Sequence, residues 1–86
     1  MNVEFHRSFD KLYIKLPAKL KIRLSERLKI FMANPLDPTL RNHALSGEWV
    51  GYRSINITGD YRAIYEETGK NGARFVAVGT HGKLYR

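Results

Sequence analysis

Hydrophobic and polar positions alternate at the start of the chain and then take up a helical spacing. Val3 and Phe5 alternate with polar neighbours, which is the pattern of a half-buried strand. Beyond Ser8, a suitable N-cap, apolar residues recur three and four positions apart until Pro17 ends the run. This spacing predicts a first helix with the apolar stripe Phe9, Leu12, Tyr13 and Leu16.

A second apolar stripe follows Pro17, a residue that suits the first turn of a helix. Its members are Leu20, Leu24, Leu28 and Phe31. Asn34 stands before Pro35 and is therefore pushed out of the helical conformation, so we expect the helix to end there. Two helices with so short a join predict an antiparallel helical hairpin.

The second half of the chain is rich in β-branched and aromatic residues. Three runs are predicted to be strands: residues 51–57, 60–66 and 74–79. Thr58–Gly59 is the expected tight turn between the first two, and residues 67–73 form a second turn cluster. The order β-α-α-β-β-β predicts an α+β fold of one domain, residues 1–86. The helical hairpin would pack on one face of a small, mostly antiparallel sheet and leave the other face free.

Composition narrows the class of protein. A chain of 86 residues has room for one hydrophobic core. The absence of cysteine excludes a disulfide scaffold and a thiolate zinc site. The N-terminus has no apolar signal region and no stretch approaches membrane-spanning length, so we expect a soluble cytoplasmic protein with no membrane contact.

The net charge of +7 favours a polyanion or an acidic protein as partner. Seven basic residues crowd one segment in which Glu26 is the single acid: Lys11, Lys15, Lys19, Lys21, Arg23, Arg27 and Lys29. This cluster is either a solvated helical face or a binding surface, and charge alone does not decide between the two.

The chain has no glycine-rich phosphate loop and no nucleophile elbow, and its three histidines are too scattered to predict a metal site. We therefore expect neither a metal nor a small-molecule cofactor. The polar and aromatic candidates gather in the second half: His43, Trp49, Arg53, Asp60, Tyr61, Arg62, His81, Lys83 and Tyr85. His6, in contrast, has no neighbour that gives it a role.

Each candidate has a structural and a functional interpretation. His43, expected in a loop, and His81 either hydrogen-bond a turn or carry protons near neutral pH. Asp60 is a common turn residue or, two positions from Arg62, lies with it on one strand face. Trp49 is favoured as a packing anchor, and Tyr85 is free to stack on a base. Taken together, these residue types supply what metal-free RNA cleavage requires: a base, an acid, cations for the phosphate and aromatic rings.

Residues 41–66, "RNHALSGEWVGYRSINITGDYRAIYE", and the later "VGTHGKLYR" resemble the YafQ branch of the RelE/ParE toxin superfamily. The resemblance covers nearly the whole chain and implies helices packed on a short curved sheet. It also implies a ribosome-dependent endoribonuclease that cleaves messenger RNA. With the side chains available for metal-free cleavage, we expect the reaction to be metal-independent and to proceed by attack of the ribose 2′-hydroxyl. The implied catalytic residues are His43, Asp60, Arg62, His81 and Tyr85, with Tyr61 as the aromatic residue after the carboxylate and Arg53 as a second phosphate contact. From their positive charge we also expect Lys83, Lys19 and Arg23 to bind RNA, the last two by contacting phosphates of ribosomal RNA.

One position departs from the family, because Asn56 stands where YafQ-like toxins have a second histidine. Asparagine can orient a group but cannot exchange a proton. Either His43, Asp60 and His81 suffice, with Arg62 in support, or the protein is a slow nuclease. We expect His43 or Asp60 as the general base and His81 as the general acid. Two other interpretations stay open, a ParE-like inhibitor of DNA gyrase without nuclease activity and an inactive relic that binds only its antitoxin. In all three cases we expect an acidic antitoxin as partner.

Overall fold

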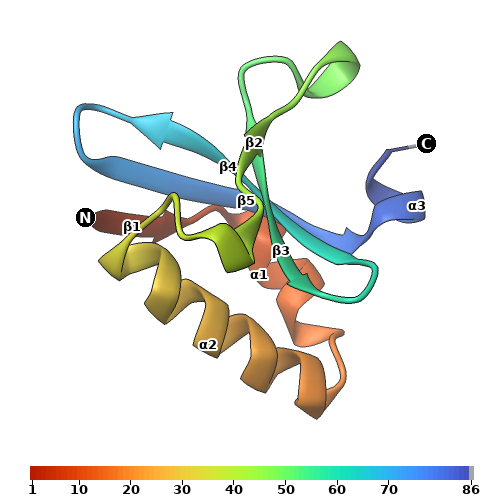
Figure 1. The fold of residues 1–86 in the computed structure, drawn as a ribbon. Helices are drawn as coiled ribbons and strands as arrows, with labels where there is room; N and C mark the ends of the chain where they lie inside the picture. The colour runs from red at the N-terminus through yellow and green to blue at the C-terminus, as the bar shows by residue number, and fades with distance from the viewer. Residues whose placement is uncertain (86) are drawn as a thin grey trace.

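The computed structural model describes residues 1–85, which form one five-stranded sheet with two helices packed on one side (Figure 1). The elements in chain order are β1 (Asn2–Phe5), α1 (Arg7–Ile14), α2 (Ala18–Ala33), the 3₁₀ turn η1 (Pro38–Leu40), β2 (His43–Ala44), the 3₁₀ turn η2 (Gly47–Trp49), β3 (Arg53–Thr58), β4 (Tyr61–Thr68), β5 (Gly72–Thr80) and α3 (His81–Leu84). The sheet order is β1-β5-β4-β3-β2, and β1–β5 is the parallel pair.

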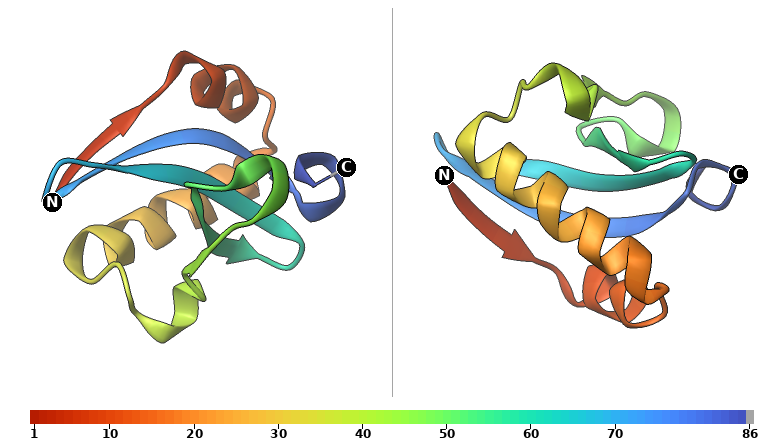
Figure 2. Two further views of the ribbon diagram at one scale, coloured as in Figure 1. Left: turned by 90° about the horizontal axis from the view of Figure 1, so that it is seen from above. Right: turned by 60° about the horizontal axis from the view of Figure 1, so that its bottom comes forward.

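The predicted α+β class, the helical hairpin and the mostly antiparallel sheet are confirmed, and Figure 2 shows that the sheet is curved. Besides the two 3₁₀ turns, two short elements were not predicted. His43, expected in a loop, begins β2, because it pairs with Ser54 of β3. The final residues, expected as a tail, begin with the single-turn helix α3.

The turn between β3 and β4 lies one residue later than predicted. Thr58 pairs with Tyr61, so the two-residue loop is Gly59–Asp60 rather than Thr58–Gly59. Gly59 has φ 48°, and a positive φ at the first loop position is where hairpins prefer glycine. Asp60 consequently belongs to the turn and not to the strand.

The N-cap of α1 is His6, not Ser8 as predicted. His6 has an extended backbone because it continues from β1, and its Nδ1 accepts a hydrogen bond from the Ser8 backbone N–H at 3.0 Å. The Ser8 hydroxyl donates instead to the Val76 carbonyl of β5, which ties α1 to the sheet. His6 thus has the structural role that the sequence did not reveal.

The core lies between the helices and the sheet and is dominated by aromatic contacts. Phe31 of α2 presents its ring edge-on to Tyr65 and to Phe75, with ring centroids 4.9 and 5.3 Å apart. Phe9 is the buried residue of α1, and its ring lies 6.0 Å from that of Phe75. Leu24 and Phe31 are the fully buried members of the second stripe. No helix among residues 1–85 is long and apolar enough to cross a membrane.

Phe75 contacts Phe9, Phe31 and Tyr65 and is inaccessible to solvent. We expect Phe75→Ala to lower the free energy of unfolding by about 3–5 kcal/mol, because it leaves a cavity at the centre of the aromatic cluster. Urea unfolding followed by circular dichroism measures the change. Ile22→Ala, at a position 61% exposed on α2, is the control and should stay within about 0.5 kcal/mol of wild type. If Phe75→Ala lowered the free energy of unfolding no more than Ile22→Ala does, this description of the core would be contradicted.

Candidate functional site

The sheet register determines which predicted site residues share a face. Ile55 and Ala63 pair and lie in the core between the sheet and the helices. Side chains alternate along a strand, so Asn56 and Arg62, which also pair, lie on the opposite face. We call this face, which points away from α1 and α2, the site face.

The sequence predicted that the second face of the sheet is free, but part of the site face is covered. Ser54, Ile64 and Ala77 form a row across β3, β4 and β5 on this face, and all are buried. A groove of about 620 Å³ runs along this region. Its lining on the site face includes Trp49, Tyr52, Ala77, Gly79, Lys83 and Leu84. The segment between β2 and β3, together with α3, therefore covers part of the site face.

Trp49 joins these two covering segments. Its indole Nε1–H donates to the Leu84 carbonyl at 2.9 Å, and its ring packs edge-on against Tyr52. A methyl group placed on Gly79 would lie 3.7 Å from Leu84 Cδ2, an ordinary van der Waals distance, so α3 folds back over β5. Trp49 is thus a packing anchor, as the sequence favoured.

His43 lies on the site face because it pairs with Ser54. Its ring is exposed, and Nδ1 lies 2.9 Å from the Arg41 carbonyl oxygen. A carbonyl oxygen can only accept, so Nδ1 carries the hydrogen of this bond. In the neutral ring Nε2 then has a free lone pair and can accept a proton.

Arg62 is held at the end of the β3–β4 hairpin. Its Nη1 donates to the carbonyl oxygens of Gly59 and Tyr61, at 2.9 and 3.1 Å. These neutral acceptors leave the positive charge of the guanidinium uncompensated, and no described acidic side chain forms an ion pair with it. The half-buried group can therefore offer its remaining N–H donors to a phosphate.

His81 and Asp60 meet at the same hairpin end. The His81 backbone N–H donates to the Asp60 carbonyl at 2.9 Å, and His81 follows Gly79, the β5 partner of Arg62, by two residues. The His81 ring is exposed and lies 4.5 Å, centroid to centroid, from the ring of Tyr85. The Tyr85 hydroxyl is buried and has no hydrogen-bond partner among the described residues. Asp60, Arg62, His81 and Tyr85 are thus gathered in one region.

Two expected members of this region lie elsewhere. Arg53 is three residues from Asn56, so the strand alternation turns it to the other face, where its Nε donates to Asn42 Oδ1 at 2.8 Å. Tyr61 packs against the core between the sheet and the helices, because it precedes Arg62 by one residue. Arg53 therefore does not lie beside Arg62 as a second phosphate contact, and the half-buried Tyr61 lies on the opposite face of the sheet from Arg62.

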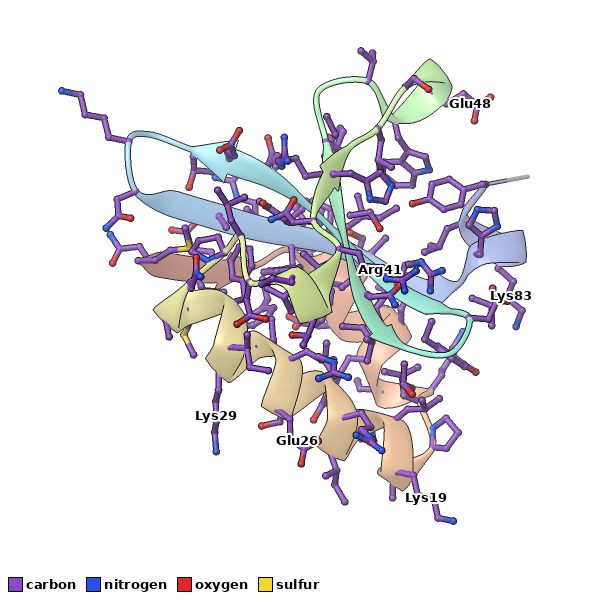
Figure 3. All side chains as sticks on the ribbon, viewed as in Figure 1. Lys19, Glu26, Lys29, Arg41, Glu48 and Lys83 are labelled. Carbon is purple, nitrogen blue, oxygen red and sulfur yellow. The ribbon has the colours of Figure 1, made fainter. Side chains whose placement is uncertain are left out.

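The basic candidates divide between the two sides of the molecule. Lys19 and Arg23 lie exposed on α2, beneath the sheet, and Figure 3 shows Lys19 pointing away from the sheet at the start of this helix. Lys83 lies exposed on α3 and lines the groove. Arg23 approaches Glu26 at 3.8 Å, an exposed pair of little energetic value. Residues 1–85 contain no group of three His, Cys, Asp or Glu side chains placed to hold a metal ion.

The segment before His43 begins with a charged cap. The Asp37 carboxylate accepts hydrogen bonds from the Thr39 hydroxyl and backbone N–H, at 2.7 and 2.9 Å, and so caps η1. These bonds to Thr39 lower the pKa of Asp37 below its ordinary value, because they favour the charged form. Leu40, the last residue of η1, is completely buried. The cap thus helps to fix the chain entering β2.

Comparisons with known proteins agree on one group of relatives. A protein-family profile described as "Bacterial toxin of type II toxin-antitoxin system, YafQ" matches residues 1–86. The mRNA interferase toxin YafQ of Escherichia coli (strain K12) is 35% identical over 65 residues, which cover 76% of this chain and 70% of that protein.

The solved structures of these relatives share the whole fold. The crystal structure of YafQ from E. coli matches with a TM-score of 0.80 at 29% identity and covers 99% of this chain and 98% of that one. The crystal structure of the E. coli DinJ–YafQ toxin–antitoxin complex matches with a TM-score of 0.76 at 29% identity, covering 99% and 97%.

The Asp37 cap predicts a pH dependence of stability. The pKa of Asp37 is lower in the folded state than in the unfolded state, where it is about 4. The ionised carboxylate therefore stabilises the fold fully above about pH 4, and this stabilisation is lost as the pH falls through the folded-state pKa. We expect Asp37→Ala to lower the melting temperature at pH 7 and to differ less from wild type as the pH falls below about 4. Glu48→Ala, which removes an exposed carboxylate from η2, is the control for charge alone. A difference between Asp37→Ala and wild type that is constant from pH 7 to pH 2 would contradict the charged cap.

Proposed function

We propose that this chain, which belongs to the YafQ family of toxins of bacterial type II toxin–antitoxin systems, is an endoribonuclease that cleaves messenger RNA on the ribosome. The observation that carries the proposal is the gathering of Asp60, Arg62 and His81 at one end of the site face. His43 lies on the same face. The mRNA interferase named among the relatives supports the same reaction class.

The reaction needs a base and an acid on either side of the scissile phosphate. His43 Nε2 takes the proton of the ribose 2′-hydroxyl, and the 2′-oxygen attacks phosphorus. The bond from phosphorus to the 5′-oxygen breaks, and His81 donates a proton to that oxygen. The products are a 2′,3′-cyclic phosphate and a 5′-hydroxyl. Asp60, exposed in the turn beside His81, is the alternative base.

Arg62 stabilises the charge that develops on the phosphate. Its guanidinium is positioned in advance by two carbonyl groups, so little reorganisation is needed when the transition state forms. Asn56, the β3 partner of Arg62, orients this region without exchanging a proton. Tyr85, packed beside His81, holds the nucleotide or the histidine ring in place.

The exposed lysines and arginines bind the ribosome and the message. Lys83, beside the groove, contacts the RNA strand being cut. Lys19 and Arg23, on the opposite side of the sheet, contact phosphates of ribosomal RNA, and this attraction weakens as salt rises. Action on translating ribosomes places the protein in the cytoplasm. Binding there supplies part of the alignment, so free RNA is a poor substrate.

An acidic antitoxin neutralises the toxin. The related DinJ–YafQ structure is a toxin–antitoxin complex, and the charge of +7 on this chain favours an acidic partner. The ordering of a disordered antitoxin tail across the basic surface would cover residues that otherwise contact RNA.

Cleavage in a purified translation system tests the proposal. We expect wild type to cut a translated message, and His81→Ala to reduce the single-turnover rate on the order of 10²- to 10⁴-fold because the acid is lost. Arg62→Ala should reduce it on the order of 10²- to 10³-fold, the usual effect of removing a donor that stabilises a transition-state charge. Primer extension on the translated message measures both the rate and the cut sites.

Arg7→Ala is the matched control, because it removes an exposed arginine at the start of α1 without touching the site face. It should cleave like wild type. Absence of cleavage by wild type would reject the nuclease, whereas unchanged rates for both His81→Ala and Arg62→Ala would reject only the assigned roles.

A further inference from the structure

We propose that Asn42 is a positioning residue that fixes the tautomer and the direction of the His43 ring, an inference that rests on the proposed role of His43 as a base. Asn42 lies between Arg41, whose carbonyl accepts from His43 Nδ1, and His43 itself. Figure 3 shows Arg41 where the chain passes from η1 into β2. The backbone conformation of Arg41 therefore decides where this carbonyl points.

Arg41 holds an unusual backbone conformation. Its φ of 47° and ψ of 45° place it in the left-handed region, where it is the single non-glycine residue among residues 1–85. A side chain disfavours this conformation, so it persists only where the neighbouring structure enforces it. On one side the chain is anchored by Leu40, which is completely buried.

On the other side the chain is anchored by the amide of Asn42. Its Nδ2 donates to the Pro35 carbonyl at 2.9 Å and to the Tyr65 hydroxyl at 2.8 Å. Its Oδ1 accepts from Arg53 Nε at 2.8 Å. One half-buried side chain thus joins the loop before η1, β3 and β4.

The three bonds also determine the orientation of the amide. Exchanging Oδ1 and Nδ2 would set an oxygen against the Pro35 carbonyl and an N–H group against the Arg53 donor. The side chain consequently has one arrangement in which all three partners are satisfied. In this arrangement Arg53 acts by orienting the Asn42 amide and not by contacting a phosphate.

The consequence for His43 is chemical. While Arg41 stays left-handed, its carbonyl holds the hydrogen on Nδ1 and leaves the Nε2 lone pair free for the 2′-hydroxyl. Without the Asn42 amide, Arg41 relaxes to an ordinary conformation and its carbonyl turns away. The ring then rotates freely and can carry its hydrogen on Nε2, where it cannot act as a base.

Nitrogen-15 NMR of the histidine rings tests this directly in the free toxin. We expect the neutral form of His43 in wild type to be the Nδ1–H tautomer, and Asn42→Ala to shift it toward the Nε2–H tautomer while the signals of His81 stay unchanged. In the translation assay Asn42→Ala should lower kcat on the order of 100-fold with a smaller change in KM, because the base is misplaced rather than the message released. Asn71→Ala, at an exposed asparagine in the β4–β5 turn, is the matched control and should match wild type in both assays.

Tyr65→Phe keeps the proposal testable if Asn42→Ala does not fold. It removes the hydroxyl that accepts from Asn42 and keeps the ring that packs on Phe31, so we expect a partial tautomer shift and a smaller loss of kcat. An Nε2–H tautomer in wild type, or an unchanged tautomer in the folded variants, overturns the positioning role. A tautomer shift with full cleavage overturns its catalytic importance. The NMR result does not depend on nuclease activity, so a wild type that fails to cut RNA would reject the proposed function separately.

Discussion

The pairing register of β4 with β3 and β5 is the constraint on which the rest of the structure depends. Because side chains alternate, Ala63 and Tyr65 enter the core while Arg62 and Ile64 face the other way. A slip of one residue would bury a guanidinium under the helices and expose the aromatic core. Burial of hydrophobic side chains on the core face of β4 therefore fixes the position of the Arg62 guanidinium on the site face.

The same register joins distant parts of the chain. It sets Arg62 opposite Gly79, and the short path from Gly79 to His81 brings the C-terminal histidine to the hairpin turn. Trp49 then holds α3 over the sheet through the Leu84 carbonyl. The helix α2 covers the opposite face of the same sheet, where Phe31 packs against Tyr65 and Phe75. The cationic helix and the candidate nuclease site consequently occupy separate sides of one small domain.

Much of the fold could be predicted from local patterns. The helical stripe ending at Phe31 could be predicted because its spacing reflects burial of one helix face. The three long strands could be predicted because their segments are rich in β-branched and aromatic residues. The predictions were wrong where a tertiary contact outweighed a local sequence preference. Ser8 is a good cap residue, but its hydroxyl is taken by Val76 across the sheet, and His6 caps instead. Likewise β2 contains two residues and exists because His43 and Ala44 have partners on β3.

The sequence by itself determined the α+β class, the basic charge and the kinds of side chain available for chemistry at His43, Asp60, Arg62 and His81. The tertiary structure alone decided which of these side chains lie together. The alternation of side chains along the paired strands places Arg62 on the site face, whereas Arg53 lies on the other face. It also decided that a carbonyl beside His43 holds one tautomer, since this depends on a left-handed Arg41 and on Asn42 bonded to three separate segments. The sequence shows which side chains are available, whereas the hydrogen bonds that orient them depend on partners far away in the chain.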